Sequence, residues 1–259
     1  CLYCDRDNRM GRKWRAHSAQ RVVAEIADGI TCYGIREVMF FDDEFIINKE
    51  RVYAICEEML SKNLKIDWEC RARVDQIDAK LLSTMRRAGC YRIRFGFESG
   101  SDRILQVLKK GITVEQSVAF AKIARKVDIE IFGYFMMGCP EETPETVQQT
   151  LDLALKLDLD FAIFSKAILI PGSEMFEWGV ANGYILKDHW QRYLQGVESN
   201  SNPGINSKVL PEKEVDRLVD AANHAFYMRP SFFLKRLKRI RSGEQLLHQA
   251  RMGRALLFS

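Results

Sequence analysis

Two cysteines at the start of the chain, Cys1 and Cys4, have the types and the spacing that most directly suggest chemistry. Cysteine thiolates hold iron–sulfur clusters. A further cysteine four positions before Cys1 would complete a C-x-x-x-C-x-x-C loop, in which three thiolates hold three irons of a 4Fe-4S cluster and leave the fourth iron open for a ligand. A Cys-x-x-Cys pair is also half of a common zinc site, so the residues downstream must decide between these interpretations.

The remaining cysteines do not supply a second pair. They stand singly in the sequence, at Cys32, Cys56, Cys70, Cys90 and Cys139. In a chain of 259 residues that is 47% hydrophobic, reduced thiols in a cytoplasmic setting are more typical than a disulfide framework. A zinc-binding module stays open as an alternative, although a closed zinc site needs four ligands and the four histidines are also isolated.

Segments with strand character and segments with helix character alternate along most of the chain. Strands are predicted over residues 37–43, 65–73, 92–98, 130–138 and 161–170. The helices between and before them start at capping residues: Ser18, Asn48, Asp78, Thr113 and Thr143. Units of about thirty residues match right-handed βαβ crossovers, which predicts a parallel sheet in a barrel, a partial barrel or a doubly wound fold.

Polar residues recur at the predicted carboxyl ends of these strands. They are Asp42, Asp43, Arg73, Glu98 and the turn of residues 138–143. Each of them alone is explained equally well as a helix cap or a turn residue. Because the carboxyl ends of parallel barrel strands face one common site, five such positions in series favour a shared active site.

The chain after Gly172 has a weaker pattern. We predict one unit over residues 1–195, a loop over 196–211 and a helical extension over 212–259. The basic and apolar residues of 229–254 indicate either weak peripheral contact with an anionic membrane or, more commonly, a solvated helix face. The net charge of +4 does not indicate a nucleic-acid partner, and no apolar run is long enough to span a membrane.

Six motifs in order resemble the core of the radical S-adenosylmethionine (SAM) enzymes. They are Cys1-Leu-Tyr-Cys4, Phe41-Asp-Asp-Glu-Phe45, Trp68-Glu-Cys-Arg-Ala-Arg73, Phe95-Gly-Phe-Glu-Ser-Gly100, Gly138-Cys-Pro-Glu-Glu-Thr143 and Ile170-Pro-Gly-Ser173. The resemblance runs from Cys1 to about Trp178. It is greatest to the branch whose members often carry a cobalamin-binding domain upstream, and the second and third motifs favour that branch.

The resemblance implies that Cys1 and Cys4 are the second and third ligands of a 4Fe-4S cluster whose open iron is chelated by SAM. One-electron cleavage of SAM then gives methionine and a 5′-deoxyadenosyl radical, so the cofactors supply the chemistry and the protein orients them. By the same resemblance, the backbone carbonyl of Tyr3 contacts the adenine amino group, and Gly138 ends the apolar strand that flanks adenine.

Other strand-end residues match further SAM contacts of the family. Phe41, Asp42 and Asp43 correspond to the segment that contacts the methionyl amino group, mainly through its backbone. Glu98 corresponds to the residue that holds the ribose hydroxyls, for which a carboxylate offers two acceptor oxygens. Arg73 is a candidate for binding the SAM carboxylate, because a guanidinium binds a carboxylate through two hydrogen bonds.

The implied fold is α/β: a partial (β/α)6 TIM-like barrel that lacks its first strand, with a helical C-terminal extension. The family's first cluster cysteine and first strand are absent from the sequence, so we expect an inactive fragment with five of the six strands.

The implied enzyme is a methyltransferase or cyclase that acts on an apolar small molecule, such as a lipid or tetrapyrrole. Cobalamin would be bound by an upstream domain, and a flavodoxin or ferredoxin would donate electrons. A tRNA-modifying methylthiotransferase is the alternative, although that group ends in a small β-barrel.

Overall fold

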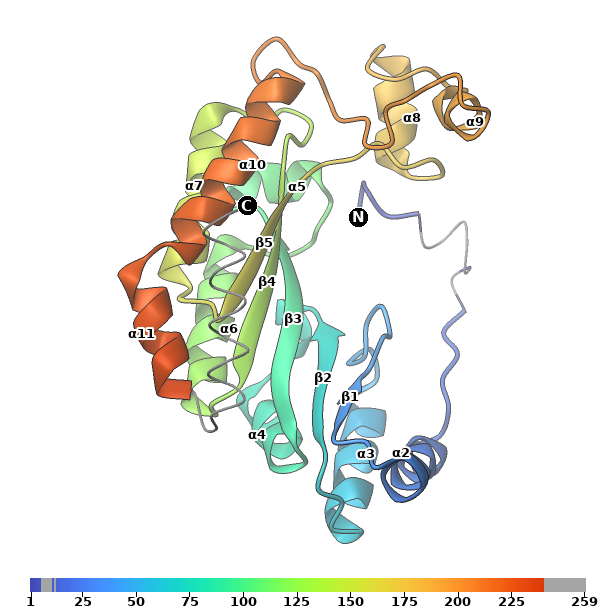
Figure 1. Ribbon diagram of the computed structural model, residues 1–259, viewed down its shortest axis with the longest axis vertical. Helices are drawn as coiled ribbons and strands as arrows, with labels where there is room; N and C mark the ends of the chain where they lie inside the picture. The colour runs from blue at the N-terminus through green and yellow to red at the C-terminus, as the bar shows by residue number, and fades with distance from the viewer. Residues whose placement is uncertain (6–10, 12, 240–259) are drawn as a thin grey trace.

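The computed structural model describes residues 1–5, 11 and 13–239. In this part of the chain, five parallel strands form one sheet in the order β1-β2-β3-β4-β5. The strands are β1 (Glu37–Met39), β2 (Asp67–Ala72), β3 (Cys90–Glu98), β4 (Glu130–Met137) and β5 (Phe161–Lys166). The sheet is twisted and curled, as Figure 1 shows, and it has the partial-barrel architecture that the sequence predicted.

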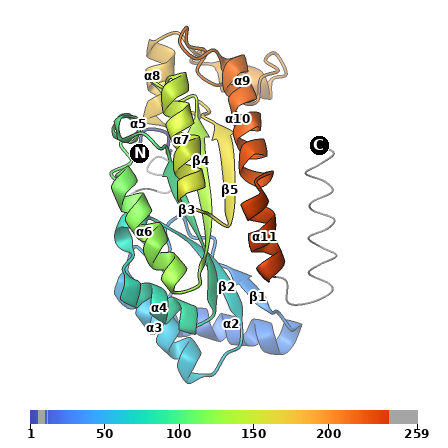
Figure 2. The same cartoon turned by 90° about the vertical axis from the view of Figure 1, so that its left-hand side faces the viewer.

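Helices connect the strands, and α6 and α7 lie over one face of the sheet (Figure 2). The connecting elements are α2 (Ala19–Tyr33), α3 (Lys49–Ser61), the short 3-10 helix η1 (Val74–Gln76), α4 (Ala79–Arg87), α5 (Asp102–Val107), α6 (Val114–Lys126) and α7 (Pro144–Lys156). Five of them begin where the sequence predicted. The capping side chains accept a hydrogen bond from a backbone N–H of the first turn at Ser18, Asn48, Asp78, Thr113 and Thr143.

The two faces of the sheet carry different side chains, because alternate residues of a strand point to opposite faces. The face toward the helices is apolar and buried, as for Phe95, whose ring centroid lies 4.2 Å from that of Phe120 in α6. We call the other one the open face. Its side chains from β2 to β5 are mainly polar or aromatic: Glu69, Arg71, Arg92, Arg94, Glu130, Phe132, Tyr134, Phe161 and Ile163.

β1 is shorter than the sequence predicted. It pairs with β2 over three residues and ends at Met39, so Phe41, Asp42 and Asp43 lie on the loop that follows, and all three are exposed. The physical reason is the pair of aspartates, since Asp is depleted in strands and an exposed carboxylate gains nothing from pairing there.

The chain beyond β5 forms α8 (Glu174–Ala181), α9 (His189–Leu194), α10 (Glu212–Tyr227) and α11 (Pro230–Arg239). β5 ends at Lys166, earlier than predicted, because the chain leaves the sheet: the N–H of Leu169 donates to the carbonyl of Pro203 (2.9 Å). α10 returns to pack on β5, where the Phe226 and Phe164 rings lie 6.1 Å apart. The first helix of the C-terminal extension therefore shares the hydrophobic core of the barrel.

No helix of the described residues is long and apolar enough to cross a membrane. Of the basic stretch 229–254, residues 240–254 lie outside the described residues. Membrane contact through that stretch therefore stays a prediction.

Candidate functional site

The Cys1–Cys4 segment is a tight turn that is anchored by its backbone. The N–H of Cys4 donates to the carbonyl of Cys1 (3.3 Å). Between them, Leu2 is buried; its N–H donates to the carbonyl of Leu108 and its carbonyl accepts from the N–H of Met175, each at 2.8 Å. Both thiols are free and exposed. The turn thus buries the Leu2 side chain and leaves both thiol groups at the surface, where they can bind a metal cluster.

A second anchor joins this turn to the end of β3. The Tyr3 hydroxyl donates to Oε1 of Glu98 (2.8 Å), and the Lys110 ammonium donates both to that same oxygen (2.7 Å) and to the Tyr3 hydroxyl (3.0 Å). Glu98 and Lys110 are buried. Burial, followed by the neighbouring Glu98 carboxylate, raises the pKa of Tyr3 far above its usual value, so Tyr3 stays a neutral donor.

The backbone of β3 is shaped to place the Glu98 carboxylate in this position. The pairing of β3 with β4 has an irregularity between Gly96 and Glu98, and Glu98 itself has a positive φ of 64°. A Cβ on Gly96 would lie 2.1 Å from Oε1 of Glu98 and 2.8 Å from Nζ of Lys110. Only glycine leaves space for this ion pair, so the Phe95-Gly-Phe-Glu motif is needed for the geometry as well as for the carboxylate.

Lys110 is a site residue that the sequence did not reveal. It precedes Gly111 in a turn, where a lysine is ordinary, and no motif marks it. Its contact with Glu98 joins residues twelve positions apart, and its contact with Tyr3 joins residues 107 positions apart. The only available signal was the strong expectation that a buried carboxylate needs a cationic or N–H partner.

The turn after β4 is held by a buried glutamate. Gly138 has φ +79°, and a Cβ there would meet Cγ1 of Val215 in α10 at 2.9 Å. Oε2 of Glu142 accepts hydrogen bonds from the N–H groups of Gly138 and Cys139, and burial raises the pKa of Glu142 to about 7. The turn packs toward the N-terminal segment, since Cys139 and Leu2 belong to the same hydrophobic cluster. Gly138 and the Cys1–Cys4 turn are therefore parts of one region.

Arg73 lies next to the same region but is already paired. Its Nε and Nη2 atoms donate to the two oxygens of Asp75 (3.0 Å each), and Nη2 also donates to the carbonyl of Lys110 (3.0 Å). The hydrogen bonds that Arg73 donates to Asp75 are the main cause of the raised pKa of Arg73. The role of Arg73 as a ligand of the SAM carboxylate stays a prediction. In that role, Arg73 would have to release the Asp75 carboxylate or bind both carboxylates at once.

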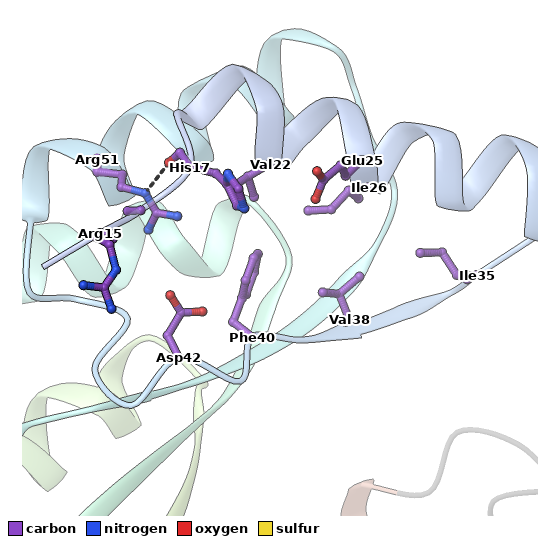
Figure 3. A pocket seen from close by; sticks show the side chains of 11 residues that line it. Arg15, His17, Val22, Glu25, Ile26, Ile35, Val38, Phe40, Asp42 and Arg51 are labelled. Atoms are coloured by element: carbon purple, nitrogen blue, oxygen red, sulfur yellow. Dashed lines mark hydrogen bonds between the residues drawn. The ribbon is translucent and has the colours of Figure 1, made fainter. Parts of the chain in front are cut away.

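The loop after β1 places its residues apart from one another. The Phe41 side chain is 70% exposed and lies under the guanidinium of Arg71, 4.2 Å from ring centroid to carbon. Asp42 faces a cavity of about 550 Å³ between α2 and β1, where its carboxylate points toward Arg15 (Figure 3). Within the part of the chain that the structure describes, no hydrogen bond or ion pair joins Asp43 to another site residue. The backbone role predicted for this segment stays a prediction.

Within the described residues, no group of three or more His, Cys, Asp or Glu side chains is arranged to hold a metal ion. The structure thus brings Tyr3, Glu98 and the cysteine turn together, with Gly138 in the adjoining cluster. It adds Lys110 and Glu142 to the residues that the sequence singled out.

Comparison with known proteins identifies relatives of this chain. It is 35% identical to an uncharacterised methyltransferase of Pyrococcus horikoshii over 235 residues, which are 91% of this chain and 50% of the relative. It is 27% identical to the anaerobic magnesium-protoporphyrin IX monomethyl ester cyclase of Cereibacter sphaeroides, covering 90% of this chain and 37% of the relative. The chain thus spans half the length or less of these two proteins.

A solved structure has the same fold. The cobalamin-dependent SAM radical enzyme OxsB, with aqua-cobalamin bound, matches with a TM-score of 0.67 and 17% identity, over 99% of this chain and 44% of OxsB. The model of the radical SAM superfamily matches residues 1–154, which is more than half of the chain. This match, together with the partial barrel and the exposed cysteine turn beside Glu98, shows that the chain belongs to the radical SAM superfamily.

Proposed function

We propose that this chain is the SAM-cleaving core of a cobalamin-dependent radical SAM methyltransferase or cyclase. The observation that carries the proposal is the exposed thiol pair of Cys1 and Cys4 on a turn that Tyr3 fixes to Glu98. The names of the relatives support methyl transfer or cyclisation, and the OxsB and cyclase matches support the cobalamin-associated branch.

The residues present fit two of the three thiolate positions that such a cluster requires. Cys1 and Cys4 are exposed, free of disulfides and held on one backbone turn, so both sulfurs are available as ligands. The third thiolate comes, on this proposal, from residues that precede Cys1 in a longer protein. When bound, the cluster and SAM supply the electron transfer and the 5′-deoxyadenosyl radical.

The chain's own residues bind and orient the nucleoside. Oε1 of Glu98 is taken by Tyr3 and Lys110, whereas Oε2 makes no hydrogen bond within the described residues. Oε2 is therefore the oxygen that accepts from a ribose hydroxyl. We further propose that the Tyr3 carbonyl and the Gly138 backbone contact adenine. The loop of Phe41, Asp42 and Asp43, with Arg73, then holds the methionyl end.

The partners and the division of the chain remain part of the proposal. The substrate is an apolar small molecule, cobalamin is bound by an upstream domain, and a flavodoxin or ferredoxin donates the electron. The proposed division is a barrel over residues 1–195, a loop over 196–211 and an extension over 212–259, of which 240–259 lie outside the described residues.

The decisive test is cluster assembly in the longer protein that contains this chain. Anaerobic reconstitution with iron and sulfide should give about four irons per chain and, with SAM and dithionite, 5′-deoxyadenosine. Cys1→Ser and Cys4→Ser should each lose most of the iron and all cleavage, because two thiolates hold a 4Fe-4S cluster poorly.

The matched control is Cys32→Ser, which removes another exposed free thiol, on α2. Iron content should be unchanged in this variant. Zinc in place of iron and sulfide, or full cleavage activity in Cys4→Ser, would overturn the proposed function.

A further inference from the structure

The open face of the sheet carries charged side chains that are only partly matched. Glu69 accepts from Arg94 (2.7 Å) and from Arg92 (3.4 Å). Glu130 pairs with Arg92 (2.7 Å) and with Arg236 of α11 (3.4 Å). These arginines are therefore held by carboxylates, and the network is fully occupied before any ligand arrives.

Arg71 stands outside this network. It lies on β2 directly beside Arg94 on β3, since the two are register partners, and both point to the open face. Among the described residues no carboxylate pairs with Arg71; its one recorded side-chain contact is the ring of Phe41. Like charges at directly opposed strand positions destabilise a sheet, and one cation–π contact offsets this only in part.

The surface beyond Arg71 and Arg94 carries aromatic side chains and one exposed apolar side chain. Arg71 and Arg94 are followed in the same row by Phe132 on β4 and Phe161 on β5. Guanidinium groups cover both rings: Arg94 lies over Phe132, and Arg92 and Arg236 lie over Phe161, each 4.6 Å from the ring centroid. The next row, toward the carboxyl ends, contains Tyr134 and Ile163, and Ile163 is 41% exposed. Three strand spacings separate β2 from β5, about 14 Å at 4.8 Å per spacing. Arg71 therefore lies about 14 Å across the sheet from the exposed apolar side chain of Ile163.

We propose that Arg71, together with Phe41, binds a carboxylate or phosphate of the substrate, whose apolar body extends across the open face toward Tyr134 and Ile163. The inference rests on the proposed function and names the substrate class: an amphipathic anion about 14 Å long, not a neutral lipid. A guanidinium offers a bidentate fork to such a group. The Phe41 ring, which is exposed beside the Arg71 guanidinium, packs against the part of the substrate that carries this anionic group.

The position also separates this subsite from the nucleoside. Arg94, beside Arg71, pairs with Phe132 of β4, and Glu98 pairs with Phe135, three residues further, which corresponds to about 10 Å along the sheet. The anion is therefore held well below the oxygen that we assign to the ribose. The part of the substrate that faces the carboxyl ends of the strands is then the part that meets the radical.

A matched pair of probes tests this subsite by binding alone. 1-Naphthyl phosphate and 1-naphthol share an aromatic body and differ by the anion, and both are measured by calorimetric or fluorescence titration. Wild type should bind the phosphate about tenfold more tightly than the alcohol or better, as expected for hydrogen bonds to charged groups. Arg71→Gln should abolish this preference and leave naphthol binding unchanged. Arg71→Lys should restore part of it.

Two controls keep the result interpretable. Arg87→Gln removes an exposed arginine on α4 and should leave the preference intact. Arg71→Gln should also unfold at the same temperature as wild type or slightly higher, because it relieves the repulsion with Arg94. An equal affinity of wild type for the two probes, or an unchanged preference in Arg71→Gln, would overturn the proposal.

A second arm separates the substrate from SAM, which also carries a carboxylate. S-Adenosylhomocysteine and 5′-methylthioadenosine share the nucleoside and differ by the amino-acid group. Arg71→Gln should leave the ratio of their affinities unchanged. A selective loss of S-adenosylhomocysteine binding with unchanged naphthyl phosphate binding would assign Arg71 to SAM and overturn this inference. The cluster test with Cys1 and Cys4 variants would be unaffected, so the two failures are distinguishable.

Discussion

The two faces of the central sheet are built on the same strands but by different rules. On the helix side, large apolar residues such as Trp68, Phe95 and Phe97 are fully buried and contact one another or the helices. On the open face, β2 to β4 present arginines and glutamates that pair across strands. One face excludes water, whereas the other pairs its arginines and glutamates with one another and leaves Arg71 outside that network.

The two faces stabilise the sheet by different interactions, and these interactions differ in how strictly each group needs a partner. Apolar contacts on the helix side are non-directional and stabilise in proportion to the area buried. Ion pairs on the open face must each be matched, because a buried charge without a partner is costly. An unmatched cation such as Arg71 is therefore tolerated only where it is accessible to solvent or to a ligand. The following substitutions test this contrast, from the largest expected effect to the smallest.

The helix side should lose the most from a single truncation. Phe97 is completely buried between Phe95 and Phe135, so Phe97→Ala should lower the free energy of unfolding by about 3–5 kcal/mol. Urea denaturation followed by circular dichroism measures this. Phe41→Ala, which truncates an exposed ring, should cost about 1 kcal/mol or less. Similar losses in both variants would contradict the contrast between the two faces.

On the open face, the largest loss should follow removal of Glu69. This carboxylate is buried and accepts hydrogen bonds from Arg92 and Arg94. Glu69→Ala therefore removes the anion that lies between two adjacent guanidinium groups. We expect a loss of about 2–3 kcal/mol in the free energy of unfolding, since the arginines are partly exposed. The control is Glu141→Ala, which breaks an exposed pair with Arg103 and should change it by less than about 1 kcal/mol.

The anchor of the cysteine turn should show coupling between its members. Lys110→Met removes the cation that holds Glu98 and should cost about 1.5–3 kcal/mol, and Tyr3→Phe should cost about 1 kcal/mol. The double variant should lose less than the sum, because both side chains act on one carboxylate oxygen. Chemical denaturation of the four proteins measures the cycle, with Lys122→Met, an exposed lysine of α6, as the control. Strict additivity would show that the three residues do not act as a unit.

The smallest effect is local to the helix side and depends on pH. The backbone N–H of Leu81, and then Lys49, lower the pKa of Asp78 in the folded chain. The ionised cap therefore stabilises the folded state fully above the unfolded pKa of about 3.9, and this stabilisation is lost as the pH falls through the lower folded pKa. Asp78→Ala should cost about 1 kcal/mol at pH 7.

Thermal unfolding at pH 7 and pH 3 checks this sign. Asp78→Asn keeps an acceptor for the cap, so it should lose less at pH 7 than the alanine variant and should show a weaker dependence on acid. An alanine variant whose deficit grows on acidification would show that the sign is wrong.

Much of the fold was predictable because its signals are local. Each capping side chain bonds within its own first turn, so Asn48 and Thr113 mark helix starts from the sequence alone. The strands were recognised by their apolar character, and their parallel pairing followed from the repeat length. Strand ends were less accurate, since pairing beyond Met39 and Lys166 depends on where the neighbouring chain runs.

The sequence by itself determined that two cysteines three residues apart precede a series of βα units with polar strand ends, because spacing and periodicity are properties of neighbouring residues. Only the tertiary structure decided that Tyr3, Glu98 and Lys110 meet at one oxygen, and that Arg71 stands beside Arg94 without a carboxylate of its own among the described residues. Such contacts join residues far apart in the chain, and they depend on register and curl of the sheet. A shift of one residue in register would have turned each of these strand side chains to the opposite face.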